Sequence, residues 1–255
     1  MKREDEPVEA SEWQWDYDVD VLCVGAGPGA LAQAIYCADL GHDVQLVDVE
    51  FPSEPTDPDT AAYVQSMTDD LGPAIDRDLE LAVVRAQPVT VSKDRRATIE
   101  PFFGSQLRVW SARCVASPFG VVYSQVPDTM TSMRAASGET IRVATVGEYR
   151  PESTCPAFEL AEWLLERARD RDLLGESGTT LQRLVFEGGQ VAGAELSTPR
   201  GTRLVRATMG VALSIGPMPE RADWPVQSDL PDGAAQVVVV SRTASRFGRV
   251  ELLYG

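Results

Sequence analysis

The start of the sequence alternates apolar runs with a helical pattern, after a polar N-terminal stretch. Residues 20–24 form a short apolar run suited to a buried parallel strand. Residues 30–40 have helical character, and Gly41 follows as a plausible C-terminal cap. Residues 44–49 form a second apolar run. The pattern predicts a strand, a glycine turn, a helix and a second strand.

The middle of the chain predicts a mixture of helices and short strands. Residues 60–71 favour a helix after a loop rich in proline and acidic residues, and residues 104–116 favour another. Apolar runs at 79–84 and 89–91 predict short strands, and residues 130–147 predict a hairpin that turns near Ser137 and Gly138.

A clear amphipathic pattern predicts a further helix with Pro156 in its first turn, Ser153 or Thr154 as its N-cap, and Gly175 at its end. Glycine and proline turns then separate short apolar runs, and the C-terminal segment adds one or two more strands. The expected strands before that segment cover residues 179–187, 190–198, 201–208 and 209–216.

Length and composition indicate a globular protein of one large domain. The chain has 255 residues, of which 44% are hydrophobic. We expect an acidic flexible tail over residues 1–17 and one domain over residues 18–255, with 51–154 as an inserted segment. No run is long and apolar enough to span a bilayer, and the start lacks the features of a secretory signal. The expected location is therefore the cytoplasm.

The net charge of −16 argues against nucleic acid or an anionic membrane as the main partner, because both are negative surfaces. The four cysteines form no C-x-x-C pair, and Cys23 and Cys37 lie in apolar segments, so we expect free thiols and no metal site. His42 is the only histidine, which disfavours a Ser-His-Asp or Cys-His hydrolase.

The turn between the first strand and helix carries a dinucleotide-binding fingerprint. Gly25 and Gly27 fit the first two glycines of G-x-G-x-x-G/A, and Ala30 fits the third small position. A side chain at Gly27 would block a pyrophosphate, whereas the helix N-terminus attracts phosphates. Asp48, at the end of the second strand, is placed to accept hydrogen bonds from the adenosine ribose, which favours FAD or NAD over NADP.

The stretch "VGAGPGALAQAIYCADLGHDVQLVD" resembles the N-terminal motif of FAD-dependent oxidoreductases, whose usual form is GAGPAG. Gly29 and Ala30 replace the common Ala-Gly pair, and Asp48 stands where the family more often has Glu. Residues 177–216 are similar to the β-meander and following strand of the same superfamily. The family commonly ends this strand in Ala-Thr-Gly, whereas here "LSIG" ends in Gly216.

The resemblance implies an α/β fold: a Rossmann-like FAD/NAD(P)-binding domain with a parallel sheet, a β-meander and an inserted middle segment. The pattern is most like the 3-ketosteroid dehydrogenase and fumarate reductase flavoprotein types. It implies FAD, with NAD as the alternative, and a flavin-dependent oxidoreductase, or its FAD-binding subunit, that passes hydride between a small-molecule substrate and FAD. The implied cofactor-binding residues are Gly25, Gly27, Pro28, Gly29, Ala30, Asp48, Leu181 (beside adenine) and Gly216.

Two other functions stay open at this point. The chain ends soon after Gly216, without the cap domain expected from the resemblance, which favours a non-catalytic binding or scaffold protein. Asp48 in place of Glu favours an NAD-binding enzyme. A homo-oligomer or a larger flavoprotein partner subunit is a further expectation.

No catalytic acid or base is identified from the sequence. Tyr123 is a candidate that more simply packs a sheet, and Arg113, Arg134 and Arg142 are candidates that more simply balance acids. Four aromatic residues are candidates for the lining of an apolar pocket or for core packing: Phe102, Phe103, Trp110 and Phe119. Three arginines form a cluster that is a candidate for binding phosphate or an acidic partner: Arg242, Arg246 and Arg249.

Overall fold

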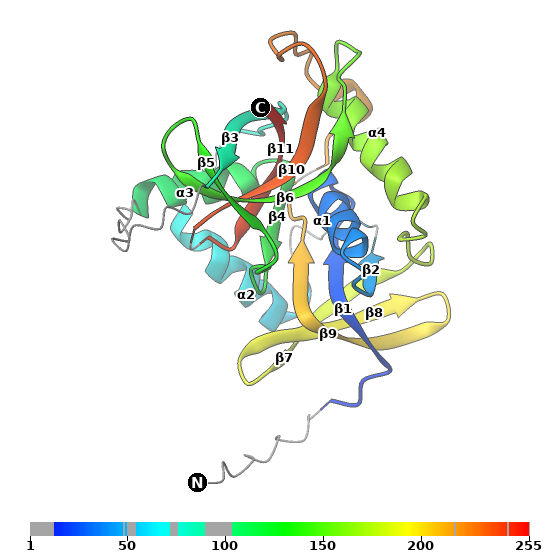
Figure 1. Ribbon diagram of the computed structural model, residues 1–255. Helices are drawn as coiled ribbons and strands as arrows, with labels where there is room; N and C mark the ends of the chain where they lie inside the picture. Colours follow the sequence, from blue (N-terminus) through cyan, green and yellow to red (C-terminus); the bar gives the residue numbers. More distant parts are fainter. Residues whose placement is uncertain are drawn as a thin grey trace.

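The structure is a computed structural model that describes residues 13–47, 49, 55–71, 76–89, 104–216, 218–243 and 245–254. Asp48, Phe102 and Phe103 lie outside the described residues. The described part is an α/β unit joined to a ring of strands (Figure 1). None of its helices is long and apolar enough to cross a membrane.

The predicted strand–turn–helix–strand unit is confirmed. It consists of β1 (Tyr17–Val24), α1 (Pro28–Asp39) and β2 (Val44–Val47). β1 pairs in parallel with β2 on one side and with β9 (Gly201–Leu213) on the other. This parallel β2-β1-β9 core is the Rossmann-like part of the fold, and the carboxyl end of β1 leads directly into the glycine turn.

α1 is buried along most of its length. Its residues from Pro28 to Cys37 are all buried. A helix that is apolar all round must be covered on every side, and α1 packs against β1, β2, the strand ring and α4 (Pro156–Arg169). Figure 1 shows it at the centre of the molecule.

β7 (Thr180–Glu187), β8 (Gln190–Thr198) and β9 form the predicted antiparallel meander. The expectation of separate strands over 201–208 and 209–216 is wrong, because β9 runs unbroken to Leu213. Its first part pairs with β8, and a bulge at Gly210 (φ 126°) shifts its register on β1. The glycine thus bends the strand instead of ending it.

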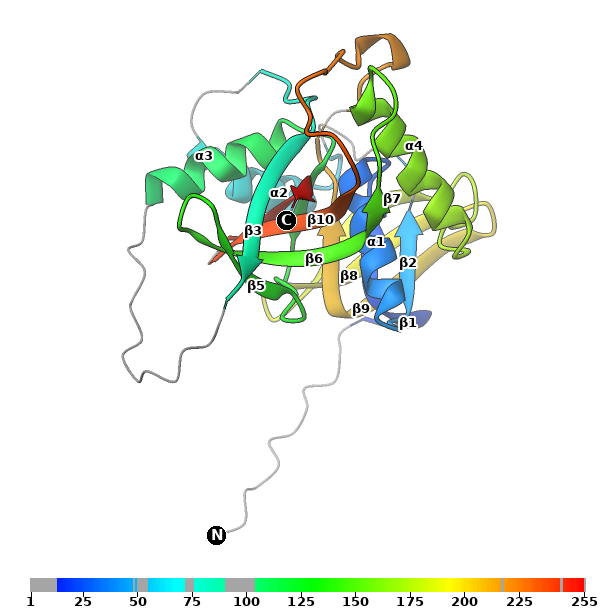
Figure 2. The ribbon, with the colours of Figure 1, turned by 45° about the horizontal axis from the view of Figure 1, so that its top comes forward.

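A ring of strands closes beside the α/β unit. β10 (Ala235–Arg242) and β11 (Phe247–Tyr254) pair with each other, β6 (Thr140–Tyr149) pairs with β10, and β3 (Ala82–Pro88) pairs with β11. β5 (Thr131–Ala135) joins β3 to β6 and closes the ring. In Figure 2 the end of β11 lies between β3 and β10. The predicted hairpin is confirmed as β5–β6, and β3 overlaps the strand expected at 79–84. Most of the strand expected at 89–91 lies outside the described residues.

β4 (Gly120–Tyr123) connects the two parts, because it pairs antiparallel with β9 and with β11. The sheet as a whole is therefore mixed, and the expected parallel arrangement is its β2-β1-β9 core. The middle segment supplies three of the ring strands and is completed by the two C-terminal strands, so it is built into the sheet and does not stand apart from it.

The other helices are α2 (Pro58–Thr68) and α3 (Gly104–Val115), both close to their predicted positions. Two expectations about α4 are wrong. Its N-cap is Cys155, without a side-chain cap bond, and it ends at Arg169 before a turn in which the N–H of Leu173 donates to the carbonyl of Ala168 at 3.0 Å.

Candidate functional site: the glycine turn

The glycine turn has the backbone form that the fingerprint predicts. Gly25 has a φ of 126°, which favours glycine, and its N–H donates to the carbonyl of Val47 at 3.1 Å. Gly27 is the N-cap of α1, and its carbonyl accepts hydrogen bonds from Ala30 and Leu31 at 3.0 and 3.2 Å. The sequence thus correctly predicts the local geometry of the turn.

A second segment of the chain lies directly on this turn. Residues Ser117–Gly120, which we name the SPFG segment, connect α3 to β4. The carbonyl of Pro118 accepts a hydrogen bond from the N–H of Gly29 at 3.2 Å. One of the N-terminal amides of α1, the groups that bind phosphate in a dinucleotide site, therefore already has a partner within the chain.

The SPFG segment is fixed by the strands on both sides of it. The N–H of Val250 in β11 donates to the carbonyl of Phe119 at 2.9 Å. The hydroxyl of Ser214, just after β9, donates to the carbonyl of Gly120 at 3.2 Å. Phe119 and Ser214 are both buried. The segment is therefore part of the packed interior.

The space in front of Gly27 is filled by the chain itself. A Cβ atom on Gly27 would lie 2.2 Å from Oγ of Ser214 and 2.8 Å from the carbonyl oxygen of Pro118. In the fingerprint, this is the glycine whose missing side chain lets the pyrophosphate approach. The residues present therefore do not fit a bound FAD or NAD in this arrangement, and we derive no chemical step through such a cofactor.

The other glycines also face protein atoms. A Cβ on Gly25 would lie 2.5 Å from the carbonyl oxygen of Ser214, and one on Gly29 would lie 2.1 Å from that of Gly120. Gly216 meets the carbonyl oxygen of Ser117 at 2.0 Å in the same test. The small residues at these positions are explained by close backbone packing, without a ligand.

Three further predicted cofactor residues lie in different surroundings. Pro28 and Ala30 are buried in the first turn of α1. Leu181 lies in β7 opposite Leu196 of β8 and packs against the core of the meander. The structure thus brings the glycines together with Ser214, which lies in the "LSIG" end that the resemblance places beside the cofactor. It also brings them together with the SPFG segment, which the sequence did not place there. The Pro-Phe-Gly turn after α3 is visible in the sequence as a turn, but its large separation from Gly27 along the chain gives no indication that the two are in contact.

Tyr123 packs in the core, as its simpler interpretation expects. It is 2% exposed, and its hydroxyl donates to Oε1 of Gln33 at 2.9 Å, while Nε2 of Gln33 donates to Sγ of Cys37 at 3.0 Å. Burial raises the pKa of the Tyr123 phenol well above its usual value, and burial also raises the pKa of Cys37, to about 11. Neither group is prepared for acid–base or nucleophilic chemistry near neutral pH.

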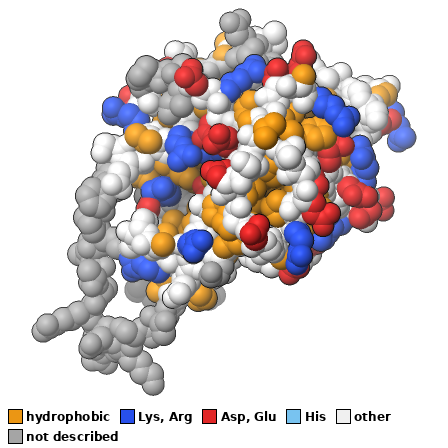
Figure 3. Space-filling model, turned by 90° about the horizontal axis from the view of Figure 1, so that it is seen from above, with side chains coloured by type: hydrophobic (Ala, Val, Ile, Leu, Met, Phe, Trp, Pro, Cys, Tyr) orange, Lys and Arg blue, Asp and Glu red, His pale blue; other side chains and the backbone are white. Residues whose placement is uncertain are grey.

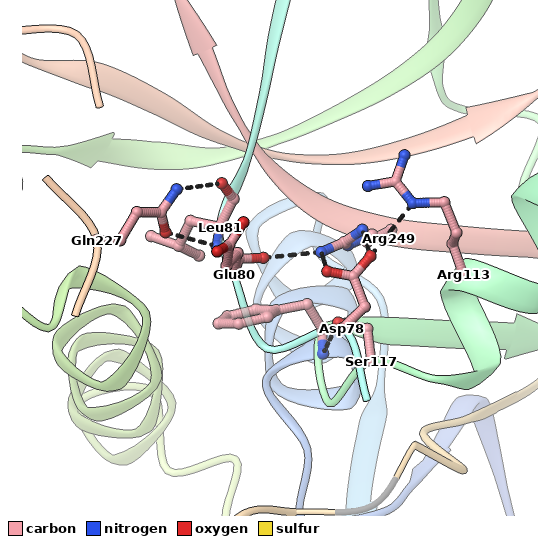
Figure 4. A network of polar contacts seen from close by, with 8 residues as sticks. Asp78, Glu80, Leu81, Arg113, Ser117, Gln227 and Arg249 are labelled. Carbon is pink, nitrogen blue, oxygen red and sulfur yellow. Dashed lines mark hydrogen bonds and ion pairs between the residues drawn. The ribbon is translucent and has the colours of Figure 1, made fainter. Parts of the chain in front are cut away.

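Arginines of the predicted clusters mostly balance acids. Arg249 is 1% exposed and donates to both carboxylate oxygens of Asp78, at 2.6 and 3.1 Å. Asp78 also pairs with Arg113 at 3.2 Å, so that two arginines share one carboxylate (Figure 4). Arg242 pairs with Glu139. These contacts support the expectation that such arginines are structural.

The described residues contain several cavities but no group of acids, cysteines and histidines that could hold a metal ion. A cavity of about 720 Å³ between β6 and α4 is lined by acids that include Glu148, Glu162 and Glu166. A cavity of about 330 Å³ lies beside Arg246. The free thiols of Cys23 and Cys37 are buried, as predicted.

Comparisons with known proteins give a distant likeness only. No family model and no curated protein matches the sequence. Among solved structures, the chain is similar to the 3-ketosteroid-delta4-(5alpha)-dehydrogenase from Rhodococcus jostii, with 18% identity and a TM-score of 0.36 over 78% of this chain and 46% of that one. It is also similar to a geranylgeranyl bacteriochlorophyll reductase-like protein from Thermoplasma acidophilum, with 16% identity and a TM-score of 0.30 over 75% and 38%.

A third similar structure is NikD, an amino acid oxidase of nikkomycin biosynthesis, with 14% identity and a TM-score of 0.30 over 92% of this chain and 70% of that one. The chain spans less than half the length of the first two proteins. The structural neighbours are oxidoreductases of the type that the sequence resembles, but TM-scores this low carry no argument about activity.

Proposed function

We propose that the protein is a non-catalytic binding or scaffold protein that keeps the dinucleotide-binding fold and closes its cofactor site with its own chain. One observation carries the proposal. Oγ of Ser214 and the carbonyl oxygen of Pro118 lie directly against Gly27, on the side that the fingerprint keeps free of a side chain so that a pyrophosphate can approach.

Two further features support this function. The N–H of Gly29 donates to Pro118, so a phosphate would have to replace an existing hydrogen bond. The SPFG segment is also held by Val250 and Ser214, so its displacement would break contacts with two strands. The buried Tyr123 and the paired arginines offer no exposed acid–base group beside the turn.

The test is to purify the protein, record its visible spectrum, and titrate it with FAD and NAD by calorimetry. We expect a colourless protein and no saturable uptake of either nucleotide. A flavoprotein whose glycine turn is open serves as the positive control. Release of FAD on denaturation, or saturable binding of added FAD or NAD, would contradict the proposal.

A flavin-dependent oxidoreductase, or the FAD-binding subunit of one, is the second candidate. It is favoured by the fingerprint itself, because Gly25, Gly27 and Ala30 have the required order and Gly25 has the required backbone conformation. This function requires the SPFG segment to leave the turn when FAD binds. Added FAD would then increase hydrogen exchange of the segment's amides, whereas the scaffold function predicts no change.

A further inference from the structure

The cavity beside Arg246 is separate from the glycine turn. It lies where α2, the segment after β4, the β7–β8 turn and the β10–β11 turn meet, and its volume is about 330 Å³. Figure 1 shows α2 next to the β7–β8 end of the meander. None of the residues that line the cavity belongs to the glycine turn or the SPFG segment.

Fixed elements form the walls of the cavity. The N–H of Leu184 in β7 donates to Oγ1 of Thr60 at 2.8 Å and thereby ties α2 to the meander. Tyr63 of α2 packs edge-on against Phe186, with 5.6 Å between the ring centroids. The β7–β8 turn passes through Gly188 and Gly189, both at positive φ. The opening is thus built from packed side chains and a tight turn.

The charge of the cavity comes from one side chain. Among the described residues that line it, Arg246 is the only charged one, and none of the described carboxylates forms an ion pair with it. Arg242 and Arg249, on either side of it in the sequence, each pair with an acid. The guanidinium of Arg246 is exposed at the mouth of the cavity and is thus available to a negatively charged ligand.

Neutral hydrogen-bonding groups surround this arginine. Oγ of Ser124 accepts the N–H of Val211 at 2.8 Å, which leaves the hydroxyl proton of Ser124 free to donate. Gln125, Gln190 and Tyr63 also line the cavity. Burial raises the pKa of the Tyr63 phenol, and the charge and hydrogen bonding of Arg246 oppose that rise, because the two side chains lie close to each other in the cavity wall.

We propose that this cavity binds a small oxyanion, a ligand with a carboxylate or phosphate group that Arg246 holds. A guanidinium donates two parallel hydrogen bonds to such a group. The Ser124 and Tyr63 hydroxyls and the two glutamine amides supply neutral donors around it. The cavity is at the lower end of the range of ligand sites, about 300–1,000 Å³, which fits a small molecule and not a dinucleotide.

The test is calorimetric titration of the whole protein with inorganic phosphate and, separately, with succinate, with ionic strength held constant by sodium chloride. We expect saturable binding of at least one of the two, and the stronger one identifies the head group. Arg246→Gln should weaken that binding about tenfold or more. Arg200→Gln is the matched control, because it removes the same charge from a side chain that is 79% exposed, and it should leave the affinity unchanged.

Tyr63→Phe provides a second readout, because it keeps the packing against Phe186 and removes only the hydroxyl. We expect it to weaken the binding with no loss of thermal stability. Absence of saturable binding of both anions, or equal affinity in wild type and Arg246→Gln, would overturn the inference. The inference does not depend on the proposed function: FAD binding that persists in Arg246→Gln would contradict the closed cofactor site and not the anion site.

Discussion

At the scale of single residues, small side chains at the glycine turn serve close packing. Gly27 allows Ser214 and Pro118 to approach α1, and Gly29 allows Gly120 to do so. The glycines that would let a pyrophosphate approach the turn therefore let Ser214 and the SPFG segment approach it instead. This is why the fingerprint alone does not separate a cofactor site from an internal contact.

Gly27→Ala tests this packing directly. The added methyl group would lie within 2.8 Å of two protein atoms, and we expect the free energy of unfolding to fall by about 1–3 kcal/mol, as for other overpacked sites. Denaturant unfolding measures the change. Because Oγ of Ser214 is the nearest atom, the cost should be smaller when Gly27→Ala is introduced into Ser214→Ala. Equal cost in both backgrounds would show that Ser214 does not fill the space.

Glu251 is a buried carboxylic acid in β11, 8% exposed. Burial raises the pKa of its carboxyl, and the charges of Arg249, Arg113 and Arg242 only partly oppose this, while Asp78 adds to it. A raised folded-state pKa means that the group favours folding below its unfolded pKa of about 4.3 and loses that contribution as the pH rises through the folded value.

We therefore expect Glu251→Gln to be more stable than wild type at pH 7, with the difference shrinking as the pH falls toward about 4. Denaturant unfolding across this pH range measures it. Glu166→Gln, on the exposed side of α4, is the control and should show no such trend. A variant that is less stable than wild type at pH 7 would mean that the Glu251 charge is stabilised by the arginines.

At the scale of elements, β11 and the segment before β3 are joined by a buried ion pair. Arg249 donates to the carboxylate of Asp78 and to the carbonyl of Glu80, at 2.8 Å for the latter. Beside it, Gln227 exchanges two hydrogen bonds with the backbone of Leu81, each at 3.0 Å (Figure 4). These contacts fix the start of β3 without a strand ladder.

Arg249→Ala should lower the free energy of unfolding by about 3–5 kcal/mol, because it leaves Asp78 and the carbonyl of Glu80 without their buried partner. Arg113→Ala is the matched control. It removes another arginine from the same carboxylate, but Arg113 is 48% exposed, so its loss should cost about 0–1 kcal/mol. Equal costs for the two variants would contradict the assignment of the buried pair.

At the scale of the whole molecule, the α/β unit and the strand ring share elements. β11 belongs to the ring and pairs with β4, and β4 pairs with β9 of the α/β unit. α1 packs against both parts. On the face seen in Figure 3, acidic and basic side chains are interspersed around apolar surface, without one sign covering the whole view.

Because the two parts share β4 and α1, we expect them to unfold together in a single transition. Tryptophan fluorescence, which reports all five tryptophans including Trp110 of α3 and Trp224 in the core, should give the same denaturant midpoint as far-ultraviolet circular dichroism. Two separated midpoints would show that the strand ring and the α/β unit are independent folding units.

The sequence by itself determined the local features of this protein. The apolar run of β1, the small-residue pattern of α1 and the hairpin at Gly138 follow from side-chain spacing and backbone preference, which act between neighbours in the chain. For the same reason, the conformation of Gly25 was predictable. The long β9 was not, because a bulge at Gly210 depends on its pairing with β1.

Only the tertiary structure decided what the glycine turn faces and how the strand ring closes. Pro118 meets Gly29 across a large separation in sequence, and the C-terminal β11 lies beside β3 and β4 for the same reason. Such contacts depend on how the packed core brings distant segments together, and no local pattern records that geometry. The fingerprint thus determined the backbone shape of the glycine turn, and tertiary packing determined that the SPFG segment lies against it.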